Sequence, residues 1–147
     1  MTRYLLDTNI ISETTKPNLA KTLADWLAVR ADNDLFVSTF TIAEIWRGIA
    51  QMAVGRRRLE LESWFAGPAG PQQFFGERVL PFDYAAALEW GFIMADARRT
   101  GRARSPIDMI IAATAIANDC IVVTANERHF DGVVEFLNPL RPHPAGR

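Results

Sequence analysis

Three acidic residues from distant parts of the chain, Asp7, Glu44 and Asp108, have a residue type and a local setting suited to a metal ion. Asp7 closes a short apolar run, and Glu44 and Asp108 each lie about one turn inside a segment with helical periodicity. Carboxylates gathered at one point repel one another, so a fold that gathers them usually supplies a cation. The three acids therefore favour a divalent-metal site.

Each acid also has a simpler interpretation as part of a helix cap or a turn. Thr41 and Glu44 have the spacing of a capping box, in which the Glu44 carboxylate bonds back to the Thr41 amide. Ser105 is a candidate N-cap before Asp108, and Asp7 could form an Asx turn. A cap prefers a solvated surface, whereas the helix that contains Asp108 is almost wholly apolar beyond it. That contrast shifts the balance toward the metal interpretation.

The elements that must position these acids alternate along the chain between strand-like and helix-like patterns. Apolar runs predict strands over residues 3–6, 35–38, 78–82, 120–124 and 133–137. Helical periodicity predicts helices over residues 18–30, 41–54, 56–65, 83–99 and 105–118, with a loop at 67–71. The 78–82 strand contains a proline, which places it at a sheet edge. Such alternation indicates an α/β fold, an α/β/α sandwich around a central parallel sheet of about five strands.

Polar residues beyond the carboxyl ends of the strands extend the candidate site, because open parallel sheets bind their ligands there. Asp7 ends the first predicted strand and Asn126 follows the fourth. Thr8 and Asn9 could orient the Asp7 carboxylate or hold a water molecule. Asn126 could supply an amide oxygen, hold a water molecule, or only begin the next turn.

Arginines near the acids are candidate contacts for a phosphate group. Arg102 and Arg104 approach Asp108 along the chain, and Arg47 lies one turn beyond Glu44. The chain has fourteen arginines and two lysines; the planar guanidinium suits phosphate, although GC-rich coding produces the same bias. A net charge of −1 gives no bulk attraction for nucleic acid, so a polyanion would have to meet such local clusters.

Other side chains have weaker functional interpretations. His129 is a general-base candidate, but no paired acid accompanies it in the sequence. Trp64 and Phe65 form an adjacent aromatic pair that we expect at a subunit interface. Cys120 is the single cysteine and lies in an apolar run, which excludes an internal disulfide and indicates a buried, inert thiol.

Length and composition are those of one globular domain. The chain has 147 residues, 49% of them hydrophobic and 22% charged. We expect a single domain over residues 1–140 and a flexible tail over 141–147. No apolar stretch approaches the roughly 20 residues that span a bilayer, and no signal peptide opens the chain. A cytoplasmic protein without a membrane partner is the expectation.

Taken together, these residues resemble those of PIN-domain ribonucleases, in particular the VapC toxins of bacterial toxin–antitoxin pairs and their FitB-like branch. The resemblance covers nearly the whole chain, and the ordered set is more specific than any one motif. The motifs that carry it are Leu5-Leu6-Asp7-Thr8-Asn9, Ile42-Ala43-Glu44-Ile45 with Gly48, Pro106-Ile107-Asp108 running into Ile111-Ala112-Ala113-Thr114-Ala115, Val123-Thr124-Ala125-Asn126 before Phe130, and Asn138-Pro139.

The resemblance implies a metal-dependent endoribonuclease that acts as the toxin of a toxin–antitoxin pair and hydrolyses RNA phosphodiester bonds with metal-activated water. Asp7, Glu44 and Asp108 match the family's metal-binding acids, which implies Mg²⁺ or Mn²⁺ as cofactor. The family's fourth acidic position falls on Asn126 and completes the catalytic set; its neutral amide would weaken a second metal site. Also implied are an RNA substrate, a cognate antitoxin protein that blocks the cleft, and a homodimer or larger assembly.

Two alternatives remain at this point. A haloacid-dehalogenase-like phosphatase would need an aspartate two positions after its nucleophile, where this chain has Asn9, and a late lysine, whereas both lysines precede residue 22. A catalytically weak or inactive PIN-like module would keep the fold and bind RNA or protein, with Asn126 in place of an acid.

Overall fold

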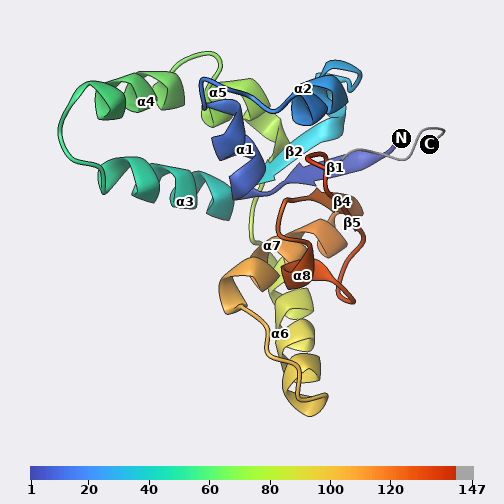
Figure 1. The fold of residues 1–147 in the computed structure, drawn as a ribbon. Coiled ribbons are helices and arrows are strands. Elements are labelled where there is room, and N and C mark those ends of the chain that lie inside the picture. Colours follow the sequence, from blue (N-terminus) through green and yellow to red (C-terminus); the bar gives the residue numbers. More distant parts are fainter. Residues whose placement is uncertain (142–147) are drawn as a thin grey trace.

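The computed structural model describes residues 1–141, and its centre is a sheet of five parallel strands in the order β3-β2-β1-β4-β5 (Figure 1). The strands are β1 (Arg3–Leu6), β2 (Leu35–Ser38), β3 (Val79–Leu80), β4 (Cys120–Val123) and β5 (Phe136–Leu137). The predicted α/β fold with about five parallel strands is confirmed, and β3 lies at an edge as its proline predicted.

Helices lie on both faces of this sheet. They are α1 (Thr8–Thr14), α2 (Lys21–Ala28), α3 (Thr39–Ala50), α4 (Arg56–Ala66), α5 (Pro71–Phe75), α6 (Tyr84–Arg99), α7 (Pro106–Ala117) and α8 (Glu127–Phe130), with short 3-10 turns at Asp32–Asp34 and Gly76–Arg78. Helices α1 to α5 supply one hydrophobic cluster, and α6, α7 and α8 supply a second. The sheet therefore separates two cores, as in an α/β/α sandwich.

Alternation along the central strands explains how one sheet serves both cores. Neighbouring residues of a strand point to opposite faces. Leu6 and Val123 accordingly pack in the cluster with α1 to α5, whereas Leu5 and Val122 pack in the cluster with α6, α7 and α8. All four side chains are almost fully buried, so the register of β1 against β4 is fixed by packing on both sides.

Helices α1, α5 and α8 were not predicted from the sequence. Helix α1 begins directly after Asp7, and its buried residues, Ile10 and Ile11, are adjacent and too few to produce a helical period. Helix α5 begins at Pro71, where a loop was predicted, because proline is well suited to a first helical turn. The predicted 78–82 and 133–137 strands are shorter in the structure, with two paired residues each.

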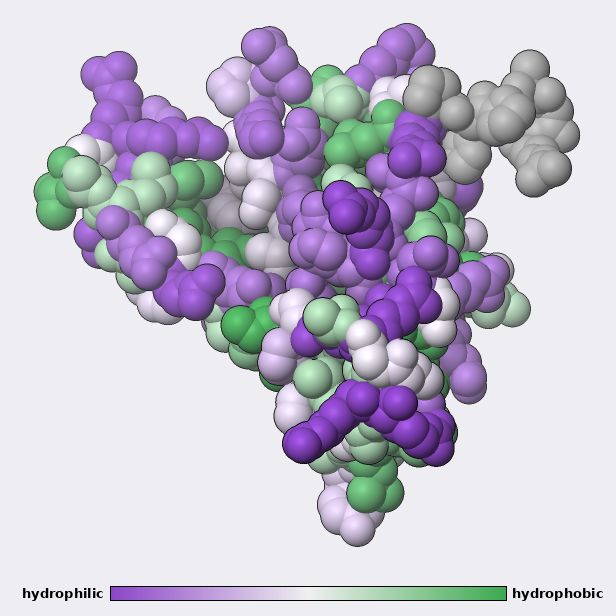
Figure 2. Space-filling model, turned by 60° about the horizontal axis from the view of Figure 1, so that its bottom comes forward, coloured by the Kyte–Doolittle hydropathy of each residue, from purple (hydrophilic) through white to green (hydrophobic). Residues whose placement is uncertain are grey.

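Helices α3 and α4 extend together away from the sheet (Figure 1), and hydrophobic surface lies at the far end of the pair (Figure 2), where Val54 is 90% exposed.

Across residues 1–141 no helix combines the length and apolar character that crossing a membrane requires. Of the predicted tail, Arg141 is described and forms an ion pair with Glu127 (2.6 Å), while residues 142–147 lie outside the described part.

Candidate active site

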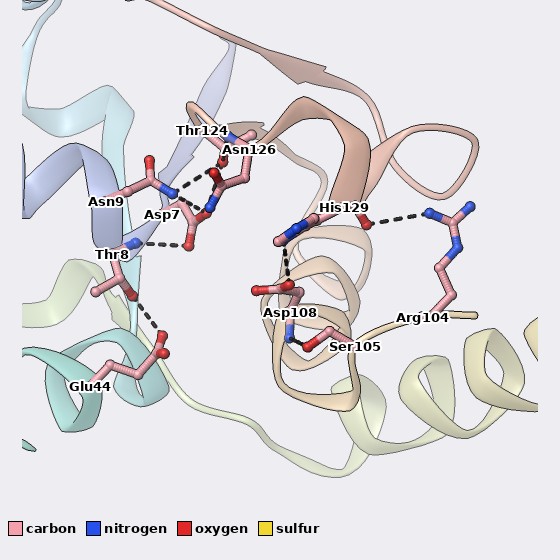
Figure 3. Close-up of polar contacts among 10 residues, drawn as sticks. All are labelled: Asp7, Thr8, Asn9, Glu44, Arg104, Ser105, Asp108, Thr124, Asn126 and His129. Atoms are coloured by element: carbon pink, nitrogen blue, oxygen red, sulfur yellow. Dashed lines mark hydrogen bonds and ion pairs between the residues drawn. The ribbon is translucent and has the colours of Figure 1, made fainter. Parts of the chain in front are cut away.

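Asp7 is the most enclosed acid of the candidate site, with 3% of its surface exposed. Its Oδ1 accepts a hydrogen bond from the backbone N–H of Thr8 (2.8 Å), and its Oδ2 accepts from the Thr124 hydroxyl (2.8 Å) and the Asn9 amide (2.8 Å) (Figure 3). Burial raises the pKa of Asp7; these hydrogen bonds oppose the shift, and the nearby Asp108 charge adds to it. Three hydrogen bonds thus fix the Asp7 carboxylate in a buried position where its negative charge is disfavoured.

Hydrogen bonds connect the junction after β1 with the junction after β4 around Asp7. The Asp7 backbone N–H donates to the Val123 carbonyl (2.9 Å), which continues the pairing of β1 with β4. The Asn9 side-chain oxygen accepts from the Ala125 N–H (3.0 Å), and the Thr124 hydroxyl oxygen accepts from the backbone N–H of Asn126 (3.0 Å). Asp7 also forms the N-cap of α1, where an Asx turn was the simpler expectation, and this role leaves its carboxylate in the site.

Glu44 reaches the same region from α3. The Thr8 hydroxyl donates to Glu44 Oε1 (2.7 Å). The N-cap of α3 is Ser38, whose hydroxyl oxygen accepts from the Thr41 N–H (3.0 Å). The capping-box interpretation of Thr41 and Glu44 is therefore wrong: the helix begins one turn earlier, and Glu44 is free to turn toward Asp7 and its neighbours.

Asp108 borders the site from the first turn of α7. Ser105 is the N-cap of this helix, as predicted, and its hydroxyl oxygen accepts from the Asp108 N–H (3.3 Å). The Asp108 carboxylate pairs through Oδ2 with Nδ1 of His129 (2.7 Å), and the Asp108 side chain is 20% exposed. His129 thus has the acidic partner that the sequence did not reveal, because α8 was not predicted and only the fold brings it beside α7.

The three predicted acids converge on one gap. Figure 3 shows the carboxylates of Asp7, Glu44 and Asp108 around a common space, and the Asp108 charge raises the pKa of Asp7. As the side chains lie, no three acids, histidines or cysteines within residues 1–141 form a group that could hold an ion. An oxygen-only donor set around a carboxylate whose charge is disfavoured nevertheless fits a hard divalent cation, provided that Glu44 rotates toward it.

The candidate phosphate contacts lie in different settings. Thr8 and Asn9 are part of the network around Asp7. Arg47 is exposed on α3. Arg104 donates to the backbone carbonyls of Asp131 (2.6 Å) and His129 (3.4 Å) and points away from the acids (Figure 3).

Arg102 lies 3.9 Å from the Asp131 carboxylate, so the fold directs both Arg102 and Arg104 to the segment after α8. Asn126 is exposed at the N-cap of α8, where its side chain makes no capping bond. Of the aromatic pair, Phe65 is buried in the chain's own core, so its predicted place at an interface is wrong; Trp46, stacked against it at 5.1 Å between ring centroids, is 45% exposed.

Known proteins resemble this chain along almost its whole length. The PIN domain family model matches residues 4–135. The VapC ribonuclease Y4jK of Sinorhizobium fredii is 33% identical over 94% of this chain and 98% of its own length, and Toxin FitB of Neisseria gonorrhoeae is 32% identical over 92% and 96%. The solved structure of FitAB bound to an IR36 DNA fragment superposes with a TM-score of 0.89 at 29% identity, covering 97% of this chain and 99% of the other.

Those matches exclude the phosphatase alternative, since sequence and fold lead to the same family over the residues that hold the three acids. The chain belongs to the PIN-domain family, among its VapC-type ribonuclease toxins.

Proposed function

We propose that this toxin is a Mg²⁺- or Mn²⁺-dependent endoribonuclease whose metal ligands are Asp7, Glu44 and Asp108. The observation that carries the proposal is the convergence of these acids, from β1, α3 and α7, on one gap, with the Asp108 charge raising the pKa of a buried Asp7. Carboxylates so placed are stabilised together only when a cation compensates them.

When bound, a divalent ion would lower the pKa of a water molecule at the site and offset the charge that grows on the scissile phosphate. Asp7 is held by three hydrogen bonds and needs no reorganisation to bind the ion. Glu44 accepts a hydrogen bond from the Thr8 hydroxyl, and on turning from Thr8 toward the gap it would bind the ion directly or through water. Asn126, at the rim, would position water through its amide.

RNA is the proposed substrate, and the cytoplasm the proposed place of action. The exposed guanidinium of Arg47 lies one turn beyond Glu44 on α3 and is the proposed contact for a backbone phosphate. Thr8 and Asn9 would support the same region through their hydrogen bonds. Arg102 and Arg104 would raise the local positive potential without direct contact, since the segment after α8 holds them.

A cognate antitoxin is the proposed protein partner. The related solved structure is that of FitAB bound to an IR36 DNA fragment. In this chain a pocket between α3, α4 and α5 is lined by Ile42, Ala43, Trp46 and Phe65, and Ile42 and Ala43 directly precede Glu44 on α3. An apolar antitoxin segment in this pocket would lie close enough to the acids to obstruct them.

A homodimer is the proposed assembly, formed through α6. Tyr84, Leu88 and Phe92 follow one another at four-residue spacing and are 79%, 61% and 69% exposed. Such a contiguous apolar stripe is typical of an interface. Sedimentation of the wild type beside Leu88→Glu tests the assembly: the variant should shift to the monomer.

RNA cleavage with and without metal tests the proposed activity. The wild type should cleave RNA with Mg²⁺ or Mn²⁺ and stop when a chelator is added, and Asp7→Asn and Asp108→Asn should cleave far more slowly under the same conditions. Undiminished cleavage by either variant would remove the mechanism. Binding of RNA without cleavage in any metal would instead indicate a PIN-like binding module, the alternative that the neutral Asn126 favours.

A further inference from the structure

One short segment of the chain contacts two of the three acids. The Thr124 hydroxyl donates to Asp7 Oδ2 (2.8 Å), and five residues later His129 Nδ1 lies 2.7 Å from Asp108 Oδ2. The segment runs from the end of β4 into α8, and it ends at Phe130, whose side chain is fully buried. The spacing between Asp7 and Asp108 is thus linked to the conformation of this segment.

The contact with His129 determines which way the Asp108 carboxylate faces. An ionised carboxylate only accepts hydrogen bonds, so the His129 Nδ1–H is the donor. It occupies Oδ2, and in Figure 3 the other oxygen points toward the side where Asp7 lies. Within residues 1–141, His129 is the side chain that bonds this carboxylate; Ser105 bonds only the backbone of Asp108.

His129 is itself anchored from behind. Its backbone N–H donates to the Asn126 carbonyl (3.1 Å), and its own carbonyl accepts from Arg104 (3.4 Å). Arg104 also donates to the Asp131 carbonyl (2.6 Å), so one guanidinium spans the end of α8. With Phe130 in the core, the imidazole is carried by a fixed backbone although half of its side chain is exposed.

We propose that His129 is a positioning residue, which holds one oxygen of Asp108 through Nδ1–H so that the other oxygen is presented to the metal ion. This inference rests on the proposed function, since it takes Asp108 as a metal ligand. A partner that donates to a ligating side chain fixes its orientation, and loss of such a partner weakens metal binding about 10–100-fold. Without His129, the Asp108 side chain, which is 20% exposed, would rotate among its rotamers and bind the ion less often in the productive geometry.

Two amide substitutions distinguish the contribution of Nδ1 from that of Nε2. The side-chain amide of His129→Asn places an N–H donor close to the position of Nδ1, whereas the longer side chain of His129→Gln places it near the position of Nε2. His129→Ala removes both donors. Mn²⁺ affinity, measured by titration calorimetry on the full chain, is the readout, with thermal unfolding as the check that each variant is folded. Arg128→Ala, at the exposed neighbouring position, is the matched control.

We expect His129→Ala and His129→Gln to bind Mn²⁺ about 10–100-fold more weakly than the wild type, and His129→Asn and Arg128→Ala to stay within about threefold. Equal affinity of His129→Ala and the wild type would overturn the inference and leave the metal site intact. Tighter binding by His129→Ala would also overturn it, because His129 would then compete with the ion. Absence of Mn²⁺ binding by the wild type would overturn the proposed function itself, and the inference with it.

Discussion

The two sides of the acid cluster are built in different ways. Asp7 is buried and accepts three hydrogen bonds, from residues of the junctions after β1 and β4. Asp108 is 20% exposed on its side chain, and within residues 1–141 one side chain, His129, bonds its carboxylate. The first acid is held by several buried hydrogen bonds, whereas the orientation of the second depends on one half-exposed partner.

Because of that difference, substitutions on the two sides should affect stability and activity to different extents. Burial raises the pKa of Asp7, so its ionised form is disfavoured in the folded chain until a cation compensates it. Asp108 stands at a helix N-terminus, where a negative charge is favoured, and its side chain is 20% exposed. Changes on the Asp7 side should therefore alter both stability and activity, and changes on the Asp108 side mainly activity.

Removal of the charge at Asp7 should have the greatest effect on cleavage. We expect Asp7→Asn to lower the rate of RNA cleavage about a thousandfold, the upper order for loss of one preorganised electrostatic group. Asp108→Asn should lower it by about a hundredfold or more, because Glu44, the remaining acid beside Asp7, can compensate in part. Single-turnover cleavage rates at saturating Mg²⁺ measure both. A milder loss in Asp7→Asn than in Asp108→Asn would reverse the roles assigned to the two sides.

Thr124→Val tests the support of Asp7 without touching its charge. Valine fills the same buried space but removes the hydroxyl that bonds Asp7 and accepts from the Asn126 N–H. We expect about 10–100-fold weaker Mn²⁺ binding and a loss of about 1–3 kcal/mol in unfolding free energy.

The matched control is Thr114→Val, which removes an equally buried hydroxyl from α7. That hydroxyl donates to the Ile110 carbonyl (2.8 Å) within its own helix and has no contact with the acids. Its Mn²⁺ affinity should equal that of the wild type in calorimetry. Equal losses in the two variants would mean that buried hydroxyls in general, rather than the bond to Asp7, control metal binding.

Ser105→Ala tests the support of Asp108. The substitution removes the N-cap of α7, which should lower the unfolding free energy by about 1 kcal/mol in denaturant titration. Cleavage should fall only a few-fold, because His129 still orients the Asp108 carboxylate. A hundredfold loss of cleavage would show that the helix cap, and not His129, positions Asp108.

The pH dependence of stability should report the raised pKa of the buried Asp7 directly. Its raised pKa means that the folded chain holds this proton more tightly than the unfolded chain does. The stability that this proton contributes to the folded chain is complete below the pKa of Asp7 in the unfolded chain, about 4. It is lost as the pH rises through the pKa of Asp7 in the folded chain. In a chelator, the Tm of the wild type should therefore fall relative to that of Asp7→Asn as the pH rises from about 4. A constant difference in Tm would contradict the shift.

The sequence predicted the site's acids more completely than their surroundings. Asp7 and Asp108 could be placed at one edge because strand ends and helix starts meet there in any parallel α/β fold, and Ser105 showed a local cap. The bond from Thr8 to Glu44 could not be foreseen, because a local capping motif competed with a contact between two distant helices. The pairing of His129 with Asp108 depends on where a one-turn helix packs, which no periodicity in four residues reveals.

The most direct measurement of the central claim is the position of manganese in crystals of the full chain soaked in Mn²⁺, located by anomalous scattering. The account predicts a peak between the carboxylates of Asp7 and Asp108, with Glu44 turned from Thr8 toward it, and no peak there in Asp7→Asn. A peak at another place, or an empty gap at a Mn²⁺ concentration that supports RNA cleavage, would contradict it.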